Sequence, residues 1–329
     1  MCHARPMIPT RILRRALEGF GLGRGRVRML SRRFGKVCLA HTRPDGTRTQ
    51  LRLVRALPDS AFRLTAETRW LMHLAHAHHL DVPIPHAWRG ASLVSHELTD
   101  ESPGAWRAIA CSWVAGRHLN HGLRRADFRR AGALLARLHL ANANAPTGIA
   151  AARHTWWIPR LFELATRLRD VAAGEPAAGA GLSPGVVLGL RQSCVALADA
   201  QAALPRGAAH EGLIHTDAHW QNLRFRRDGV GIVDFEDFAN GRFMLDVACL
   251  WSKVERRRGS EAMLDAVLAG YHDVRSLPTG FMRDLRVMLA FRRVDYAGWV
   301  LSWSRPDLLP WGPALLAEAP AYVERQLTW

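Results

Sequence analysis

Hydrophobic and polar positions alternate in short runs through the first third of the chain. Between residues 27 and 54 lie three such runs, RVRML, KVCLAH and TQLRLV, which are separated by the loop SRRFG and the turn RPDG. Within RPDG, Pro44 fixes its own φ and Gly46 tolerates left-handed backbone, so this turn has a physical basis. The pattern therefore predicts an antiparallel meander of three strands.

A helical stripe follows this meander. From Ser60 to His79 apolar side chains recur at helical spacing, and the stripe ends before VPIP, where two prolines cannot continue a helix. Further extended runs at 91–98 and 108–114 add two strands. We therefore expect residues 1–115 to form an N-terminal lobe with a five-stranded sheet and one main helix.

The chain beyond about residue 120 has mainly helical spacing. Helices are expected at 128–141, 158–171, 186–204, from about 244 onward, and at 261–271, 279–303 and 313–327. One interruption, residues 213–233, combines a loop with two short strands that turn at Asp228-Gly229. These patterns predict a two-lobed α+β fold, in which residues 116–329 form a larger, helical C-terminal lobe after a hinge near residue 115.

The composition is that of an ordinary globular chain with an excess of positive charge. Hydrophobic residues make up 48% and charged residues 22% of the 329 positions, which is enough apolar material for a sizeable core. The net charge of +16 is compatible with a nucleic-acid partner, but the basic residues are scattered along the chain. Only Lys36 and Lys253 are lysines among the 45 basic residues, which indicates a general composition bias. We therefore disfavour a nucleic-acid partner.

The sequence predicts a protein of the cytoplasm without a membrane span. No 18 apolar residues run together, and the N-terminus lacks the continuous apolar segment of a secretion signal. Residues 8–20 have the pattern of a short basic amphipathic helix, for which packing on its own domain is favoured over contact with a membrane surface. Five separated cysteines without a C-x-x-C pair indicate a reducing compartment. No pattern indicates an oligomeric state.

The segment from His215 to Asp234 carries the clearest candidate chemistry. The sequence HTDAHWQN has the form H-x-D-x-x-x-x-N, and Asp234 follows Asn222 by twelve residues, within VDFE. Transfer of a γ-phosphoryl group needs a carboxylate beside the attacking hydroxyl and magnesium that bridges the phosphates. Asp217 can supply the first, whereas Asn222 and Asp234 offer the hard oxygen ligands that Mg²⁺ takes. Taken alone, the motif also fits a loop in which Asp217 only caps the backbone.

The same segment resembles the catalytic and metal-binding loops of the aminoglycoside phosphotransferases and choline/homoserine kinases, which have a protein-kinase-like fold. Those loops have the approximate forms H-x-D-x-H-x-x-N and I-D-F-[DE], so the match includes His219 and Glu236. Further matches occur in the order of the family, from QLRLVRA to FMLDVACLW. The segment LRVMLAFRRVDYAGWVLSW is similar to late helices of the stress-response kinases within this group.

The resemblance implies a phosphotransferase that uses ATP and Mg²⁺ and has a hydroxyl-bearing acceptor. Arg52 occupies the position of the strand cation that holds the ATP phosphates, and Glu67 occupies that of the helix glutamate that pairs with it. Trp113 and Val114, within CSWVAGR, lie at the hinge that contacts adenine. Asp246 matches the buried aspartate that braces the catalytic loop. The loop SRRFGKV departs from the family because it has one glycine, which leaves the phosphate contacts unplaced.

Several roles have an alternative interpretation. Arg52 and Glu67 also fit solvated charges, since other arginines lie close to Arg52 in the sequence. His215 is expected to be structural, whereas His219 either braces the loop or lines the acceptor site. Glu236 is expected to add to the metal shell or to bind the acceptor, and Asp237 fits either that role or simple solvation.

The acceptor is not identified by the sequence. A small-molecule hydroxyl is the main hypothesis, although a net charge of +16 does not indicate an acidic pocket for a polycationic aminoglycoside. A protein Ser/Thr kinase of the stress-response type is one alternative. A nucleotide-binding pseudokinase or a basic interaction protein is another, and the intact Asp217, Asn222 and Asp234 argue against it.

Overall fold

The computed structural model divides into two compact units. It describes residues 8–33, 35–99, 104–118, 122–149, 161, 163–166, 168, 183–301 and 310–328. Unit 1 comprises Met1–His118, Ala143–Arg153 and Leu223–Glu236, and unit 2 comprises Leu119–Asn142, His154–Asn222 and Asp237–Trp329. The first unit thus ends close to the boundary expected at residue 115, but it also includes residues 223–236 from the second half of the chain.

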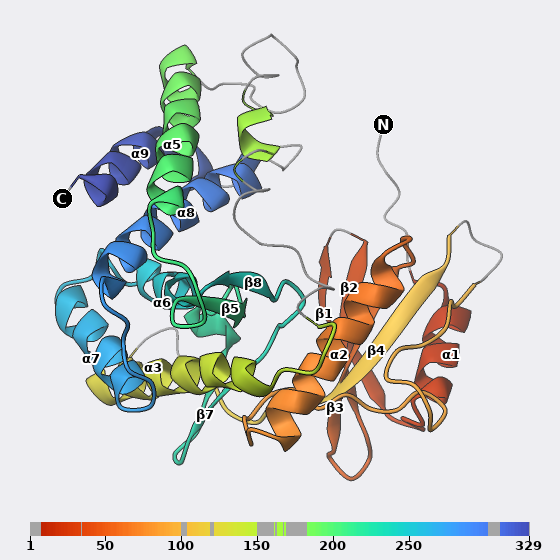
Figure 1. The fold of residues 1–329 in the computed structure, drawn as a ribbon. Helices are drawn as coiled ribbons and strands as arrows, with labels where there is room; N and C mark the ends of the chain where they lie inside the picture. Colours follow the sequence, from red (N-terminus) through yellow and green to blue (C-terminus); the bar gives the residue numbers. More distant parts are fainter. Residues whose placement is uncertain are drawn as a thin grey trace. The chain divides into compact units, whose positions relative to one another are not determined.

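The centre of unit 1 is an antiparallel sheet with strand order β1-β2-β3-β4 (Figure 1). Its strands are β1 (Arg26–Arg33), β2 (Lys36–Thr42), β3 (Arg48–Arg55) and β4 (Trp106–Ser112). The predicted meander of three strands is confirmed by β1, β2 and β3. The first strand is longer than expected and takes in most of the loop SRRFG, because Gly35 at φ 72° allows a tight turn.

The prediction of a fifth strand at residues 91–98 was wrong. Within the described part of the chain this segment contributes only an isolated bridge between Leu98 and Trp106, beside the edge of β4. The reason lies at Ser95, whose Oγ accepts the Ala108 N–H at 2.8 Å in place of a backbone carbonyl. A side chain that takes a ladder donor interrupts strand pairing, so the sheet has four strands.

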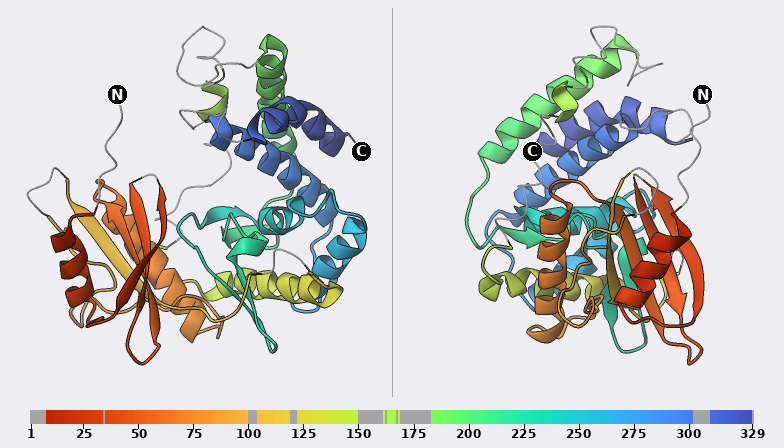
Figure 2. Two further views of the ribbon diagram at one scale, coloured as in Figure 1. Left: turned by 180° about the vertical axis from the view of Figure 1, so that it is seen from behind. Right: turned by 90° about the vertical axis from the view of Figure 1, so that its right-hand side faces the viewer.

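Two helices cover opposite faces of this sheet (Figure 2). Helix α1 (Thr10–Gly19) buries Ile12 and Ala16 completely, in a core that includes Leu51 and Leu53 of β3. The expected basic helix near the N-terminus therefore packs on its own domain. Helix α2 (Ser60–His76) lies on the other face, toward which alternation along β3 turns the side chain of Arg52. No helix in the described ranges is both long and apolar enough to cross a membrane.

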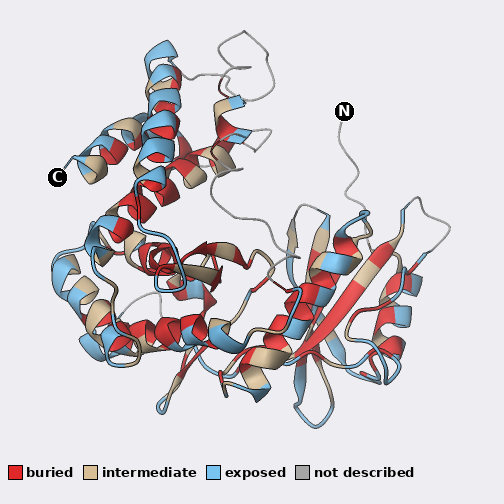
Figure 3. Ribbon diagram, viewed as in Figure 1, coloured by how far each residue is buried: buried red, intermediate tan, exposed pale blue. Residues whose placement is uncertain are grey.

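Unit 2 is mainly helical, as the sequence predicts. Its helices are α3 (Arg125–Leu140), α5 (Pro184–Ala202), α6 (Phe243–Ser252), α7 (Ser260–His272), α8 (Phe281–Leu301) and α9 (Gly312–Leu327). The strands β5 (Glu211–Ile214) and β8 (Ala239–Arg242) pair antiparallel. The expected helix at 158–171 lies largely outside the described residues. Residues 243–250 of α6 are all buried, so α6 forms the centre of this unit (Figure 3).

The predicted short strands on either side of Asp228-Gly229 are present as a hairpin. Strand β6 (Leu223–Phe225) pairs with β7 (Val230–Ile232), and both belong to unit 1. Leu223, Phe225, Val230 and Ile232 are all buried, which is why this short pair is stable. The hairpin leads directly into the segment Val233-Asp234-Phe235-Glu236.

Candidate active site

The loop with the H-x-D motif follows β5 and ends in the short 3-10 helix η2 (Trp220–Asn222). Its entry is strained, because Thr216 is β-branched and has φ 70°. Asp246 of α6 holds this backbone: its two carboxylate oxygens accept the N–H groups of His215 and Thr216, each at 2.8 Å. Asp246, His215 and Thr216 are fully buried, so the loop is fixed by hydrogen bonds that water does not weaken.

His139 of α3 supports Asp246 from the other side. Its Nε2 lies 3.1 Å from Asp246 Oδ2, and its Nδ1 lies 2.9 Å from the Tyr271 hydroxyl. Burial lowers the pKa of His139, although Asp246 opposes this shift. A neutral imidazole that donates from Nε2 to Asp246 and accepts the Tyr271 O–H at Nδ1 satisfies both contacts.

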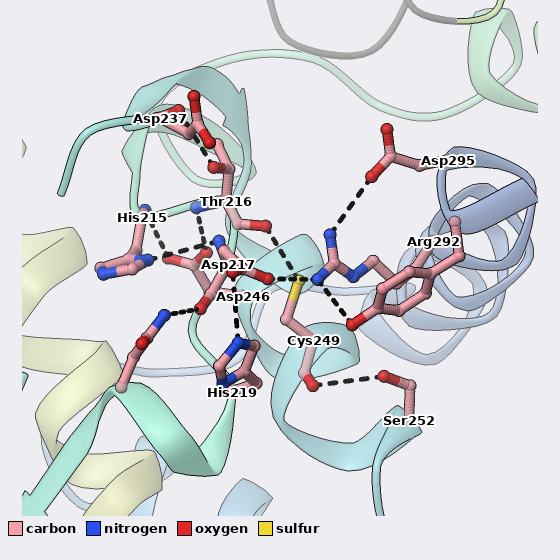
Figure 4. A network of polar contacts seen from close by, with 12 residues as sticks. His215, Thr216, Asp217, His219, Asp237, Asp246, Cys249, Ser252, Arg292 and Asp295 are labelled. Carbon is pink, nitrogen blue, oxygen red and sulfur yellow. Dashed lines mark hydrogen bonds and ion pairs between the residues drawn. The ribbon is translucent and has the colours of Figure 1, made fainter. Parts of the chain in front are cut away.

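Asp217 lies at the centre of a polar network (Figure 4). Its side chain is 36% exposed, with Oδ2 3.2 Å from His219 Nε2 and Oδ1 paired with the guanidinium of Arg292. Its backbone N–H donates to His215 Nδ1 at 3.3 Å. Burial alone would raise the pKa of Asp217, but the charge of Arg292 and the hydrogen bond from His219 outweigh it and hold this pKa below its usual range. Asp217 is therefore a carboxylate that is ionised at neutral pH and reachable from solvent.

Asn222 is held firmly against the same loop. Its Nδ2 donates to the backbone carbonyl of Asp217 at 2.9 Å, and its own N–H donates to the carbonyl of His219 at 2.9 Å. The neighbouring Trp220 packs edge-on against Phe128, with ring centroids 4.6 Å apart. Because the amide nitrogen is used in the loop, the oxygen is the end of Asn222 available to a cation.

Arg292 is the residue at this site that the sequence analysis missed. It comes from α8, its side chain is only 7% exposed, and it contacts Asp295 at 3.2 Å and the Tyr296 hydroxyl at 3.1 Å (Figure 4). Burial would lower the pKa of Arg292, but the surrounding groups raise it well above its usual value, so it stays charged. One signal was available: Arg292 follows Leu285 and Met288 along the buried stripe of α8, where a charged residue needs a partner.

A second cluster of charges lies within unit 1. Arg52 NH2 lies 2.5 Å from Glu67 Oε2, its NH1 lies 3.6 Å from Glu236 Oε2, and Lys36 Nζ lies 2.8 Å from Glu236 Oε1. Burial would raise the pKa of Glu236, but Arg52 and Lys36 lower it. Arg52 and Glu67 are 7% and 3% exposed, so neither is the solvated charge of the alternative interpretation. Lys36 was not among the residues predicted for the site, because it is separated from Glu236 by 200 positions.

Asp234 presents an exposed carboxylate at the end of the β6–β7 hairpin. Its φ of 73° is unusual for a residue other than glycine and turns the chain sharply before Phe235. Asp234 lines a pocket of unit 1 together with Arg52, Glu67, Ile109 and Cys111. The cation of the expected phosphate site and the acid of the expected metal site thus share one pocket wall.

Trp113 and Val114 directly follow the end of β4. Val114 is 5% exposed and packs so closely on Gly231 that a Cβ there would lie 2.7 Å from Val114 Cγ1. The ring of Trp113 is covered by the guanidinium of Arg48, 3.6 Å from the ring centroid. The indole face on that side is therefore occupied by a cation.

The candidate residues thus form two groups, one in each unit. Unit 2 brings together His215, Asp217, His219, Asn222 and Asp246, whereas unit 1 holds Arg52, Glu67, Trp113, Val114, Asp234 and Glu236. Asp237 is half-buried in unit 2, and its carbonyl accepts the Thr216 hydroxyl at 3.0 Å. Across the described chain no three His, Cys, Asp or Glu side chains gather as a metal site.

A family model described as the phosphotransferase enzyme family matches residues 37–285 of the chain. This range begins within β2 and ends within α8, so it contains both groups of candidate residues. Lys36 and Arg292, which contact these groups, lie outside it. A search of curated proteins gave no match to the sequence.

Several solved structures have a similar fold. The amicoumacin kinase hAmiN, in complex with AMP-PNP, Ca²⁺ and Ami, is 18% identical over 91% of this chain and 88% of that one, with a TM-score of 0.76. A microcompartment-associated aminopropanol kinase is 19% identical over 97% and 95% of the two chains, with a TM-score of 0.72. An aminoglycoside 2'-phosphotransferase-IIIa bound to GDP is 17% identical over 96% and 99%, with a TM-score of 0.66. At these identities the likeness establishes the fold, and it confirms the predicted α+β, protein-kinase-like class.

Proposed function

The chain belongs to the phosphotransferase enzyme family, and from this premise we propose that it transfers the γ-phosphate of ATP to a hydroxyl group of a small molecule. The observation that carries the proposal is the state of Asp217. An ionised, partly exposed carboxylate stands on a loop that Asp246 fixes from behind, and it is accompanied by His219 and Arg292. A carboxylate held beside an attacking hydroxyl is what this reaction requires of the protein.

Asp217 would act mainly by orienting the acceptor. In the reaction, the bond from the γ-phosphorus to the ADP oxygen breaks, the bond to the acceptor oxygen forms, and the hydroxyl proton passes to Asp217. Because its pKa is held below the usual range, Asp217 is a weak base that gains the proton only late, when the acceptor oxygen has become acidic. Phosphoryl transfer tolerates this, since its transition state is loose and demands little nucleophile activation.

The residues of unit 1 would bind the nucleotide. Arg52 is a permanent cation that Glu67 holds in one orientation, which suits it to neutralise phosphate oxygens. Trp113 and Val114 would contact adenine, supported by their position directly after β4. Glu236 is already shared between Arg52 and Lys36, so its proposed part is to order these two cations.

Asn222 and Asp234 would hold Mg²⁺. Asn222 keeps an amide oxygen available and Asp234 is an exposed carboxylate, so each offers a hard oxygen of the kind that Mg²⁺ takes. When bound, Mg²⁺ supplies charge neutralisation of the phosphates. His215 and Asp246 would serve only to keep the loop in place, and His219 would fix the second oxygen of Asp217.

A small acceptor is supported over a protein by the named substrates of the solved relatives, which include amicoumacin and aminopropanol. Around Asp217 the charges are mixed, with Asp295 and Arg292 both close by, so the net charge of +16 does not describe the local field. The cytoplasm is the proposed compartment, supported by free thiols at Cys38, Cys111, Cys194 and Cys249.

The test is an ADP-release screen with ATP and Mg²⁺ over aminoglycosides, amino alcohols, sugars and generic protein substrates. We expect turnover with at least one small hydroxyl compound and a loss of about 10²–10⁴-fold in kcat for Asp217→Asn. Asp228→Asn is the matched control, because that acid lies in the β6–β7 turn and its side chain is 82% exposed. The proposal would be abandoned if no acceptor class released ADP, or if Asp217→Asn matched the control.

A further inference from the structure

We propose that Arg292 is the positioning residue of the active site: its guanidinium fixes the orientation in which the Asp217 carboxylate meets the acceptor. This inference rests on the proposed function, because it takes Asp217 as the group that contacts the acceptor. No sequence motif assigns a role to Arg292, and the matched family range ends at residue 285, before it.

The guanidinium of Arg292 is itself held from three sides. Its NH2 contacts Asp217 Oδ1 and the Tyr296 hydroxyl, its NH1 lies 3.2 Å from Asp295 Oδ2, and its carbon lies 4.3 Å from the centroid of the Tyr296 ring (Figure 4). A planar group with partners on both terminal nitrogens and an aromatic ring beside it has one orientation. The backbone of α8 therefore determines where the charge stands.

This fixed charge determines the orientation of Asp217. Oδ1 faces Arg292 and Oδ2 faces His219 Nε2 at 3.2 Å, so rotation about the Cβ–Cγ bond would break both contacts. Each carboxylate oxygen has a second acceptor site, so a hydroxyl can bind without displacing either partner. If Arg292 were absent, His219 would be the one remaining side-chain partner of this carboxylate within the described residues. An error of about 1 Å in such a group costs about 10²-fold in rate.

The neighbouring Arg293 lies on the same helix and serves as a comparison, because its contacts are only structural. Its guanidinium lies 2.8 Å from Glu255 Oε1 and 4.1 Å from the Tyr322 ring centroid, and its side chain is 12% exposed. Within the described part of the chain, Arg293 contacts Glu255, Glu318 and Tyr322, which all lie outside the catalytic loop. Arg292 instead contacts Asp217, a side chain that solvent reaches. The two arginines are therefore similar in burial and charge, but Arg292 contacts the catalytic carboxylate and Arg293 contacts Glu255.

The experiment compares full-length Arg292→Gln and Arg292→Lys with the control Arg293→Gln. In crystal structures we expect the Asp217 carboxylate to leave its position in Arg292→Gln and to keep it in Arg293→Gln. With the acceptor found in the ADP-release screen, Arg292→Gln should lower kcat about 10²-fold with the KM for ATP unchanged. In Arg292→Lys, kcat should be about tenfold higher than in Arg292→Gln. A single ammonium can keep the contact with Asp217, but it cannot contact Asp217 and Asp295 in the fixed geometry of a guanidinium.

Two results would overturn the inference. The first is an Asp217 carboxylate that stays in place in Arg292→Gln, and the second is an equal loss of kcat in Arg293→Gln, which would point to general loosening of α8. If Arg292→Gln fails to fold, Arg292→Lys gives the same decision: a kcat equal to that of wild type excludes a positioning role. A wild-type enzyme without any acceptor would refute the proposed function instead, while the crystal comparison would still test the contact.

Discussion

Single buried polar groups keep the catalytic loop in its strained shape. Asp246 is the main one, since both of its oxygens accept backbone N–H groups of the loop and one also faces His139. A buried carboxylate is costly unless it is hydrogen-bonded, and each oxygen of Asp246 has at least one such partner. His139 must stay neutral to accept the Tyr271 O–H, so the support of the loop depends on its protonation state.

This dependence predicts a loss of stability in mild acid. Because the pKa of folded His139 lies below its usual value of 6.5, the unfolded chain binds a proton below about pH 6.5 that the folded chain does not. The free energy of unfolding should therefore fall by about 1.4 kcal/mol for each pH unit below that point, until the folded pKa is reached. Urea denaturation of wild type and His139→Gln between pH 7.5 and about pH 5 measures this pH dependence of the free energy of unfolding.

Other histidines also have a lowered pKa and would add to the same loss of stability in acid. The variant His139→Gln therefore isolates the contribution of His139. Burial also lowers the pKa of His41 and His86 in the other unit. We expect a shallower pH dependence in His139→Gln than in wild type. Equal slopes in the two proteins would mean that folding does not lower the pKa of His139, contrary to its proposed neutral form.

Among the helices, α8 connects the site with the rest of unit 2. Its buried face carries Asp284 near the start and Arg292 two turns later, each paired with a group on another element. Asp284 accepts hydrogen bonds from Nε and Nη2 of Arg242, the last residue of β8, and both residues are 1% exposed. This pair joins α8 to the β5–β8 strands that lead into the catalytic loop.

Breaking this pair should destabilise unit 2 strongly. Asp284→Ala would leave a buried guanidinium with Pro205 O and the more distant Glu211 as its remaining partners, and we expect the free energy of unfolding to fall by about 3–5 kcal/mol. Urea denaturation measures the loss. The control is Glu318→Ala, which removes a pair with Arg256 that is mostly in solvent and should cost less than about 1 kcal/mol. Similar losses in both variants would contradict the prediction.

For the whole molecule, the two groups of candidate residues each come from segments that lie far apart in the sequence. The two groups of residues belong to units built from three separate stretches of chain each. A nucleotide with its metal would bind the folded chain and not the unfolded one. Ligand binding should therefore appear as a gain in the stability of the protein.

MgATP should raise the melting temperature of the protein. At a concentration of 100 times its Kd, the added stability is about 2.7 kcal/mol. Asp234→Asn should lose the part of the gain that depends on Mg²⁺, because an amide is a weaker ligand than a carboxylate, whereas Asp228→Asn should behave as wild type. Thermal melts with ATP, with and without Mg²⁺ or EDTA, measure this. An equal Mg²⁺-dependent shift in Asp234→Asn would exclude Asp234 as a ligand.

The sequence by itself determined what local pattern encodes. The meander of β1 to β3, the hairpin at Asp228-Gly229 and the helices followed from periodicity and turn residues, since these depend on neighbours along the chain. The family and its enzyme class followed from the resemblance of the segment His215 to Asp234 to known phosphotransferase loops, together with further matches in the order of that family.

Only the tertiary structure decided which side chains from distant parts of the sequence come into contact. Arg292 contacts Asp217 across 75 positions and Lys36 contacts Glu236 across 200, and no local periodicity records such pairs. The expected fifth strand was lost because one hydroxyl, that of Ser95, competes for a backbone donor of β4. Long-range packing chooses among locally equivalent arrangements, so the partners of the catalytic carboxylate emerge only when the helices are in place.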